Sequence, residues 1–269
     1  MKIHTVISGI HSLYINRHLL RSLVIREVKN SYRGTVLGFL WVVLYPLMML
    51  TVYNFVFGDI LNTRWEAKGQ TSNGVAMLFC GLIIHAFFSE TLTQCTSVVL
   101  SNPSYVKKIV FPLELLPVTK LVSANFRMAI GLLSSFILIL AKDKAIPTTS
   151  LLAPLVLLPL IVLTSGFAWF LAALGVFFRD VGQIVGLTMS VLLFLSPIFY
   201  PATAGPKLAQ TLYYLNPLTY PIEELRGVLI LGEQIDWFHW VVYVIMASAT
   251  ALAGLWVFQK ARPAFPDVI

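Results

Sequence analysis

The chain has 269 residues, of which 58% are hydrophobic and 12% are charged, with a mean hydropathy of +0.82 and a formal net charge of +7. Soluble globular domains carry about a quarter charged residues, so this composition excludes an ordinary soluble domain and predicts a polytopic membrane protein. The net positive charge raises nucleic-acid binding as an alternative, which depends on where the cations lie.

Long apolar windows follow one another along the chain and predict an all-α fold with six transmembrane helices. Each window has at least the roughly 17 residues that a predominantly apolar membrane-spanning helix needs. The whole chain, residues 1–269, then forms a single transmembrane domain. The predicted spans are residues 36–57, 75–99, 118–141, 151–178, 183–200 and 238–258.

The lysines and arginines outside the spans are distributed unevenly. Twelve lie in the two terminal segments, the second and fourth loops and the edges of these loops, whereas six lie in the alternate loops. The positive-inside rule therefore places both termini in the cytoplasm, with the chain in the inner, or plasma, membrane. The basic balance indicates topology and attraction to anionic membrane lipid, and no nucleic-acid partner is predicted.

Residues 14–33 precede the first span and have an amphipathic helical pattern. Leucines and valines form one face, and polar side chains recur on the other at steps of three and four, namely His18, Ser22, Arg26, Lys29 and Arg33. This pattern predicts a helix lying on the inner membrane surface. The alternative, a helix packed in a soluble domain, lacks a soluble domain to pack against.

Aromatic residues are concentrated on one face of the first span, where Trp41, Tyr45 and Met48 recur at helical spacing. Near a membrane end, Trp and Tyr commonly form an interface belt. Tyr45 lies deep for that interpretation, and aromatic rings also stack on the apolar faces of sugars. A carbohydrate channel and ordinary core packing both stay open. The predicted channel-lining residues are Trp41, Tyr45, Met48, Thr188, Ser196, Phe199 and Tyr200.

Two pairs of glycines four residues apart lie near the cytoplasmic ends of spans one and five. They are Gly34 with Gly38 and Gly182 with Gly186. Small residues at this spacing let helix backbones approach closely. The pairs therefore predict a crossing of these two spans near the inner face.

Two ionisable residues, Glu90 and Arg127, are predicted inside spans two and three. An unpaired charge in hydrocarbon costs several kcal/mol. An antiparallel hairpin of the two spans would place both residues about 15 Å into the membrane, so we expect them to pair. The pair would either lock the two spans together or face a hydrated path.

Two of the loops have unusual compositions. Residues 101–117 contain three prolines around a basic and apolar centre, which predicts short rigid turns. Residues 206–232 are too apolar for a solvated linker and predict two short re-entrant periplasmic helices. Irregular backbone at that depth must be buried in protein or face a water-filled cavity.

Catalytic and nucleotide-binding signatures are missing from the sequence. Neither HExxH nor GxSxG occurs, and the histidines lie apart from acidic or cysteine partners, so no catalytic or metal site is predicted. The phosphate-binding pattern GxxxxGK[ST] does not occur either. If transport is driven by ATP, the ATPase is another polypeptide. A secondary transporter would more often show two matched halves with several intramembrane acids.

Four segments, in order and over essentially the whole chain, resemble the permease subunits of ABC polysaccharide exporters, which include O-antigen, teichoic-acid and capsule permeases. The segments are LLRSLVIREVKNSYRGTVLGFLWVVLYPLMML, NPSYVKKIVFPLELLP, GVFFRDVGQIVG followed by FLSPIFYP, and YYLNPLTYPIEELRGVLI. The resemblance implies the channel-forming half of an exporter of lipid-linked polysaccharide, with O-antigen first among the substrates. It further implies a homodimer with two copies of a separate ATPase subunit that binds ATP and Mg, and no cofactor in this chain.

The resemblance also implies roles for particular segments. Spans one and five would line the channel, and residues 101–117 would hold the coupling helix that enters the ATPase, here with Tyr105, Lys107, Lys108, Phe111 and Glu114. We expect three cations to attract the diphosphate of the lipid carrier at the inner surface, namely Arg26, Lys29 and Arg33. A capsule, teichoic-acid or small-molecule exporter of the same fold stays open, and so does, more remotely, a membrane-embedded enzyme.

Overall fold

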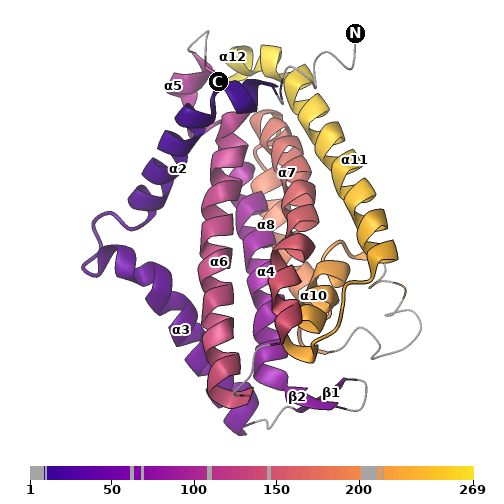
Figure 1. Ribbon diagram of the computed structural model, residues 1–269. Helices are drawn as coiled ribbons and strands as arrows, with labels where there is room; N and C mark the ends of the chain where they lie inside the picture. Colours follow the sequence, from indigo (N-terminus) through magenta and orange to yellow (C-terminus); the bar gives the residue numbers. More distant parts are fainter. Residues whose placement is uncertain are drawn as a thin grey trace.

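The computed structural model describes residues 9, 11–60, 64–67, 70–107, 111–143, 147–200, 211, 213 and 215–269. Five long helices form the body of the molecule: α4 (Gly74–Cys95), α6 (Leu115–Asp143), α7 (Ala153–Phe177), α8 (Val181–Leu195) and α11 (Trp237–Ala261). Two further helices, α2 (Arg17–Ser31) and α3 (Trp41–Tyr53), pack along the outer side of α6 (Figure 1).

Short elements complete the two ends of this bundle. At one end lie α5 (Pro103–Val106), η5 (Arg262–Ala264) and α12 (Phe265–Val268), and at the other end lie α10 (Thr219–Arg226), η4 (Gly227–Leu231) and a two-stranded sheet (Figure 1). The strands β1 (Arg64–Ala67) and β2 (Gln70–Asn73) are antiparallel. The remaining short helices are η1 (Gly38–Leu40), η2 (Asn54–Ile60) and η3 (Thr148–Leu152).

The described residues contain four helical stretches that are long and apolar enough to cross a membrane. They are Gly38–Ile60, Gly74–Cys95, Thr148–Phe177 and Trp237–Val268. α8 is a shorter apolar helix of 15 residues, and α6 has 29 residues. The protein is therefore a helical multi-pass membrane protein, as predicted, and the total of six spans stays a prediction.

α4 is the central helix of the bundle and contacts α6, α7, α8 and α10. In its most apolar stretch 78% of the residues are buried, whereas only 11% are buried in the stretch Gly38–Ile60 that contains α3. An apolar helix that is hydrophobic all round is stable either inside a protein or against lipid. α4 therefore forms the core, and α3 lies at its margin.

Glycines set the closest helix contacts, between α7 and its neighbours. A Cβ atom on Gly254 would lie 2.0 Å from the carbonyl oxygen of Gly166, and a Cβ atom on Gly175 would lie 1.7 Å from that of Thr96. No side chain fits at these distances, so α7 and α11 cross with their backbones in contact. These glycines are not among the four glycines predicted from the sequence to lie at a helix crossing.

The predicted crossing of spans one and five at the paired glycines is wrong within this chain. Gly34 has φ of +85° and Gly38 has φ of +51°, so they shape the turn between α2 and α3. A Cβ atom on either would meet no described atom within 4 Å, and the same holds for Gly186, which lies in α8. Gly182 would approach the Thr96 hydroxyl at 3.4 Å, an ordinary contact.

Several predicted boundaries also change. The surface helix ends at Ser31, so Arg33 lies in the following turn, and the first span begins at Gly38. The fifth span ends at Leu195, because the helical conformation is disfavoured before Pro197 and Ser196 is extended. Of the predicted re-entrant helices, the described residues contain α10, η4 and helical residues 211, 213 and 215.

Arg226, at the end of α10, fixes the chain where α8 stops. Its side chain is 2% exposed and donates to the carbonyl oxygens of Met77 at 2.8 Å, Pro197 at 2.6 Å and Ile198 at 2.9 Å. Its guanidinium also pairs with Glu223 at 2.8 Å. One cation thus ties α10 to the start of α4 and to the unwound end of α8.

We predict that Arg226→Met destabilises the fold by about 3–5 kcal/mol, because it leaves three buried carbonyl groups without their donor. Thermal unfolding of the detergent-solubilised chain measures the loss. Arg179→Met is the matched control, since Arg179 is exposed in the turn between α7 and α8. Equal unfolding midpoints for the two variants would contradict this role of Arg226.

Candidate functional site: a polar and aromatic cavity beside α3

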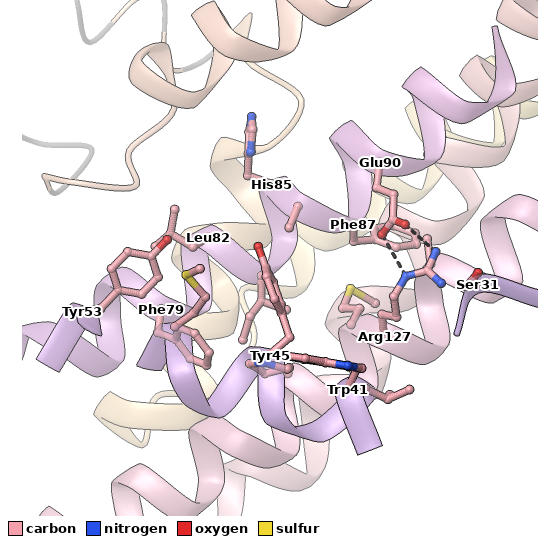
Figure 2. A pocket seen from close by; sticks show the side chains of 18 of the residues that line it. Ser31, Trp41, Tyr45, Tyr53, Phe79, Leu82, His85, Phe87, Glu90 and Arg127 are labelled. Atoms are coloured by element: carbon pink, nitrogen blue, oxygen red, sulfur yellow. Dashed lines mark hydrogen bonds and ion pairs between the residues drawn. The ribbon is translucent and has the colours of Figure 1, made fainter. Parts of the chain in front are cut away.

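A cavity of about 760 Å³ lies between α3 on one side and α4 with α6 on the other. It extends from the turn after α2, at Ser31 and Thr35, to Tyr53 of α3 and Phe79 of α4. Figure 2 shows the aromatic side chains of α3 facing those of α4 across this space. The cavity is therefore a long space whose walls come from different helices.

The polar part of the cavity is the pair Glu90 and Arg127, which forms as predicted. Arg127 donates to the carboxylate through both Nη2, at 2.6 Å, and Nε, at 3.0 Å (Figure 2). Each partner makes one further hydrogen bond: Glu90 accepts from Gln94 at 2.9 Å, and Arg127 donates to the hydroxyl of Ser123 at 3.1 Å. The two side chains remain 34% and 21% exposed, so they offer polar groups to the cavity as well as joining α4 to α6.

The aromatic part of the cavity comes from α3. Trp41, Tyr45 and Tyr53 line it, and Phe79 and Phe87 of α4 stand opposite. Tyr45 is 61% exposed, so its ring is accessible in this chain. Sugar rings have C–H-rich faces that stack on such rings and hydroxyl groups that bind charged side chains. The cavity combines both kinds of group.

The structure separates the predicted channel-lining residues. Trp41 and Tyr45 line the cavity, whereas Met48 is 56% exposed and does not line it; Met49 lines the cavity instead. Thr188 is exposed on α8, and its hydroxyl donates to the carbonyl oxygen of Ile184. These residues stay predicted contacts of the substrate, but they do not share one site within this chain.

Residues after α8 pack against protein. Ser196 is fully buried, donates to the carbonyl oxygen of Leu192 at 2.7 Å and accepts from Asn216 at 2.8 Å. It cannot line a hydrated path, so that prediction is wrong, and the reason is the end of α8 before Pro197. Phe199 stacks on Phe194 with ring centroids 5.8 Å apart. The hydroxyl of Tyr200, a further predicted lining residue, donates to the carbonyl oxygen of Phe194.

The cations predicted to attract a lipid diphosphate lie on or just after α2. Arg26, Lys29 and Arg33 are all exposed. Arg26 donates from Nη2 to the hydroxyl of Tyr105 at 2.6 Å, and its guanidinium lies 5.8 Å from the centre of that ring. The arginine therefore also connects α2 to the loop that contains α5.

The predicted coupling loop is compact. The rings of Tyr105 and Phe111 stack with centroids 4.3 Å apart and an interplanar angle of 16°. Lys107 is exposed, and Lys108 lies outside the described residues. Glu114 is only 1% exposed and accepts from Arg262 at 3.0 Å. A direct contact of Glu114 with a partner is thus ruled out by burial, and this part of the prediction is wrong.

The junction before α11 carries an electrostatic cap. Asp236 accepts from the backbone amides of Phe238 and His239 and from the His239 ring at 2.8 Å. These hydrogen bonds lower the pKa of the Asp236 carboxyl group. Glu224 accepts from the Asp236 amide at 2.7 Å, and burial raises the pKa of Glu224. The cap joins α10 to the start of α11.

Sequence reasoning missed Arg226 and Arg262, which contact residues far away along the chain. By position Arg226 is one of the six cations in the alternate loops, although an arginine within an apolar re-entrant segment is itself a signal of a buried partner. Arg262 gave no signal, because its partners Phe111 and Glu114 precede it by about 150 residues.

Comparison with known proteins gives matches along most of the chain. The family model described as ABC-2 type transporter matches residues 18–230. An O-antigen export system permease protein, RfbA, of Myxococcus xanthus is 30% identical over 266 residues, which cover 97% of this chain and 98% of that protein. A protein of the same name from Klebsiella pneumoniae is 23% identical over 248 residues, covering 91% and 92%. The polysialic acid transport protein KpsM of Escherichia coli is 22% identical over 251 residues, covering 93% and 96%.

We predict that Glu90→Arg and Arg127→Glu each lower the free energy of unfolding by about 1–2 kcal/mol, because each places two like charges together at a partly exposed site. The double variant restores the opposite charges and recovers most of the loss. The yield of monodisperse protein after detergent extraction, together with thermal unfolding, checks this. A double variant no better than the worse single variant would contradict the pairing.

Proposed function

Because the chain belongs to the ABC-2 type transporter family, we propose that it is the membrane-spanning permease subunit of an ATP-driven exporter of lipid-linked polysaccharide. The observation that carries this proposal is the similarity to an O-antigen export permease at 30% identity over 97% of the chain. The match extends over nearly the whole length of both chains. O-antigen is therefore the first candidate substrate.

The cavity beside α3 supports a carbohydrate as the substrate. A sugar chain in a membrane needs hydroxyl partners, because unsatisfied polar groups are costly in hydrocarbon. The exposed edges of Glu90 and Arg127 supply such partners, and Trp41 with Tyr45 supplies stacking surfaces. Stacking contacts depend only weakly on direction. One sugar unit can therefore replace the previous one on the same aromatic ring without a large energy barrier.

The energy for export comes from a separate ATPase subunit, which holds ATP and Mg. The sequence contains no GxxxxGK[ST] motif for this purpose. The loop with α5 presents Tyr105, Lys107 and Phe111 beside α2, and we propose that this loop, together with Lys108, contacts the ATPase. In this arrangement hydrolysis moves the loop, and the loop moves the helices.

A second copy of the chain completes the channel. α3 and α8 expose apolar side chains such as Leu187 at 69% and Phe194 at 65%, in addition to the aromatic residues of α3. Apolar faces of this kind are covered by lipid or by protein. Because the cavity lies directly behind α3, its position favours a second copy that packs against α3 and closes the cavity. We propose a homodimer with two ATPase subunits.

The orientation follows from the cations. The excess of lysine and arginine supports an orientation with both termini in the cytoplasm and the chain in the inner membrane. α2 then lies at the cytoplasmic surface, where Arg26, Lys29 and Arg33 attract the diphosphate of a lipid carrier. The carrier enters beside α3, and the cavity receives the first sugars.

A capsular polysaccharide is the second candidate substrate. It is supported by the match to the polysialic acid transport protein of Escherichia coli, which covers 93% of this chain at 22% identity. Both candidates are polysaccharides, so the same cavity chemistry applies. The glycan that accumulates when the chain is missing identifies the substrate.

We predict that deletion of the gene in its native host removes the polysaccharide from the cell surface and leaves lipid-linked glycan inside, as measured by surface labelling and glycan analysis of membranes. Re-expression of the chain restores export. Tyr45→Ala lowers the restored export rate by about fivefold, since a stacking contact of an aromatic ring is worth ~0.5–1.5 kcal/mol. Met246→Ala, at an exposed position of α11 that does not line the cavity, is the control and leaves the rate near normal.

Two results would count against this account. Unchanged surface polysaccharide in the deletion strain would refute polysaccharide export as the function. Normal export by Tyr45→Ala, with the deletion phenotype as expected, would refute only the role of the cavity.

A further inference from the structure

α2 holds the N-terminal part of the loop that contains α5. Arg26 of α2 donates to the Tyr105 hydroxyl at 2.6 Å, and Tyr105 stacks on Phe111 across the loop. Next to this contact, Lys120 at the start of α6 pairs with Glu27 of α2 at 2.5 Å. The loop is therefore closed on itself and fastened to α2.

The last part of the loop is held by the segment after α11. Arg262 donates from Nη2 to the carbonyl oxygen of Phe111 at 2.9 Å and from Nη1 to the carboxylate of Glu114 at 3.0 Å. The backbone carbonyl of Glu114 also accepts from the Trp169 ring of α7 at 3.1 Å. One guanidinium thus grips the loop at two points, three residues apart.

Burial makes this contact strong and specific. The Glu114 side chain is 2% exposed, so its charge is stabilised in this position by Arg262. The surroundings are apolar, with Leu113, Phe258 and Phe265 all buried in one cluster. The planar fork of arginine reaches two acceptors at once, which a lysine ammonium group does not do with the same geometry. Arg262, which directly follows α11, therefore connects the loop to this helix.

α11 transmits any displacement further, because it crosses α7 with backbone contact. Gly254 stands two helical turns before Arg262, and its Cα has no room for even a methyl group beside Gly166. Packed helices of this kind shift as units and do not deform. A movement of the loop would consequently shift α11 and α7 together.

We propose that Arg262 is a positioning residue for energy coupling, which joins the loop to α11 so that displacement of the loop by the ATPase moves the α7–α11 pair. This inference rests on the proposed function and adds a second connection to it, beside the one through α2. The residue touches neither substrate nor nucleotide. Its effect is on how much transport each hydrolysis event produces.

The test uses the complete complex in inverted membrane vesicles from the native host, which contain the host's own lipid-linked glycan. ATP hydrolysis and glycan delivered to the lumen are measured in the same vesicles, and their ratio is the readout. Arg262→Lys keeps the charge beside Glu114 but loses the fork, and Glu114→Gln keeps the shape but loses the charge. Lys260→Arg is the matched control, because Lys260 is exposed in the same helical turn and contacts the ring of Trp256 instead of the loop.

We expect both variants to lower the ratio of glycan to ATP by about fivefold or more, the low end for coupling between two sites, while hydrolysis continues. The control keeps the wild-type ratio. An unchanged ratio of glycan to ATP in both variants would overturn the proposal. This includes the case in which the amount of complex, ATP hydrolysis and glycan delivery all fall together, because such a loss is purely structural. Wild-type vesicles that deliver no glycan would instead refute the proposed function.

Discussion

The guanidinium of Arg226, bound to the carbonyl oxygens of Met77, Pro197 and Ile198, is the contact on which the rest of the fold depends. A bilayer offers no hydrogen bonds to a chain that leaves the helical conformation, so protein groups must supply them. α8 leaves that conformation at Ser196, deep in an apolar segment, and Arg226 provides the missing donors. These hydrogen bonds hold the ends of α8 and α10 beside the start of α4.

The opposite end of the bundle obeys the same rule with different residues. There Arg262 satisfies a buried carboxylate and a loop carbonyl, and the ring of Trp169 satisfies another carbonyl. Between these two fixed ends, the stretch Gly38–Ile60 that contains α3 is the least buried of the four candidate spans, and the cavity lies beside it. A rigid frame with one loosely held helix suits a transporter, because the path can widen at α3 without disturbing the core.

The sequence predicted those features that depend on hydropathy and on distance along a helix. The pairing of Glu90 with Arg127 is one, because two antiparallel spans place them at equal depth. Sequence-based prediction failed for residues whose role depends on backbone conformation. Spacing alone could not reveal that Gly34 and Gly38 have positive φ, or that α8 ends before Pro197 and Ser196 is buried. It also failed for partners distant in sequence, such as Glu114 with Arg262, since no local pattern encodes which buried acceptor an arginine will find. The close crossing at Gly166 and Gly254 belongs to the same class, because each glycine is unremarkable in its own helix.

If polysaccharide passes along α3 of this chain, as we propose, a crosslinker placed on α3 will capture it during export. A photoreactive amino acid at position 45, in the intact complex with an ATPase that binds but does not hydrolyse ATP, would be irradiated in cells whose glycan carries a radioactive label. We expect labelled glycan attached to the permease from position 45 and none from position 241 of α11, an exposed apolar position outside the cavity. Equal labelling from both positions, or none from position 45 while wild-type cells export the glycan, would contradict it.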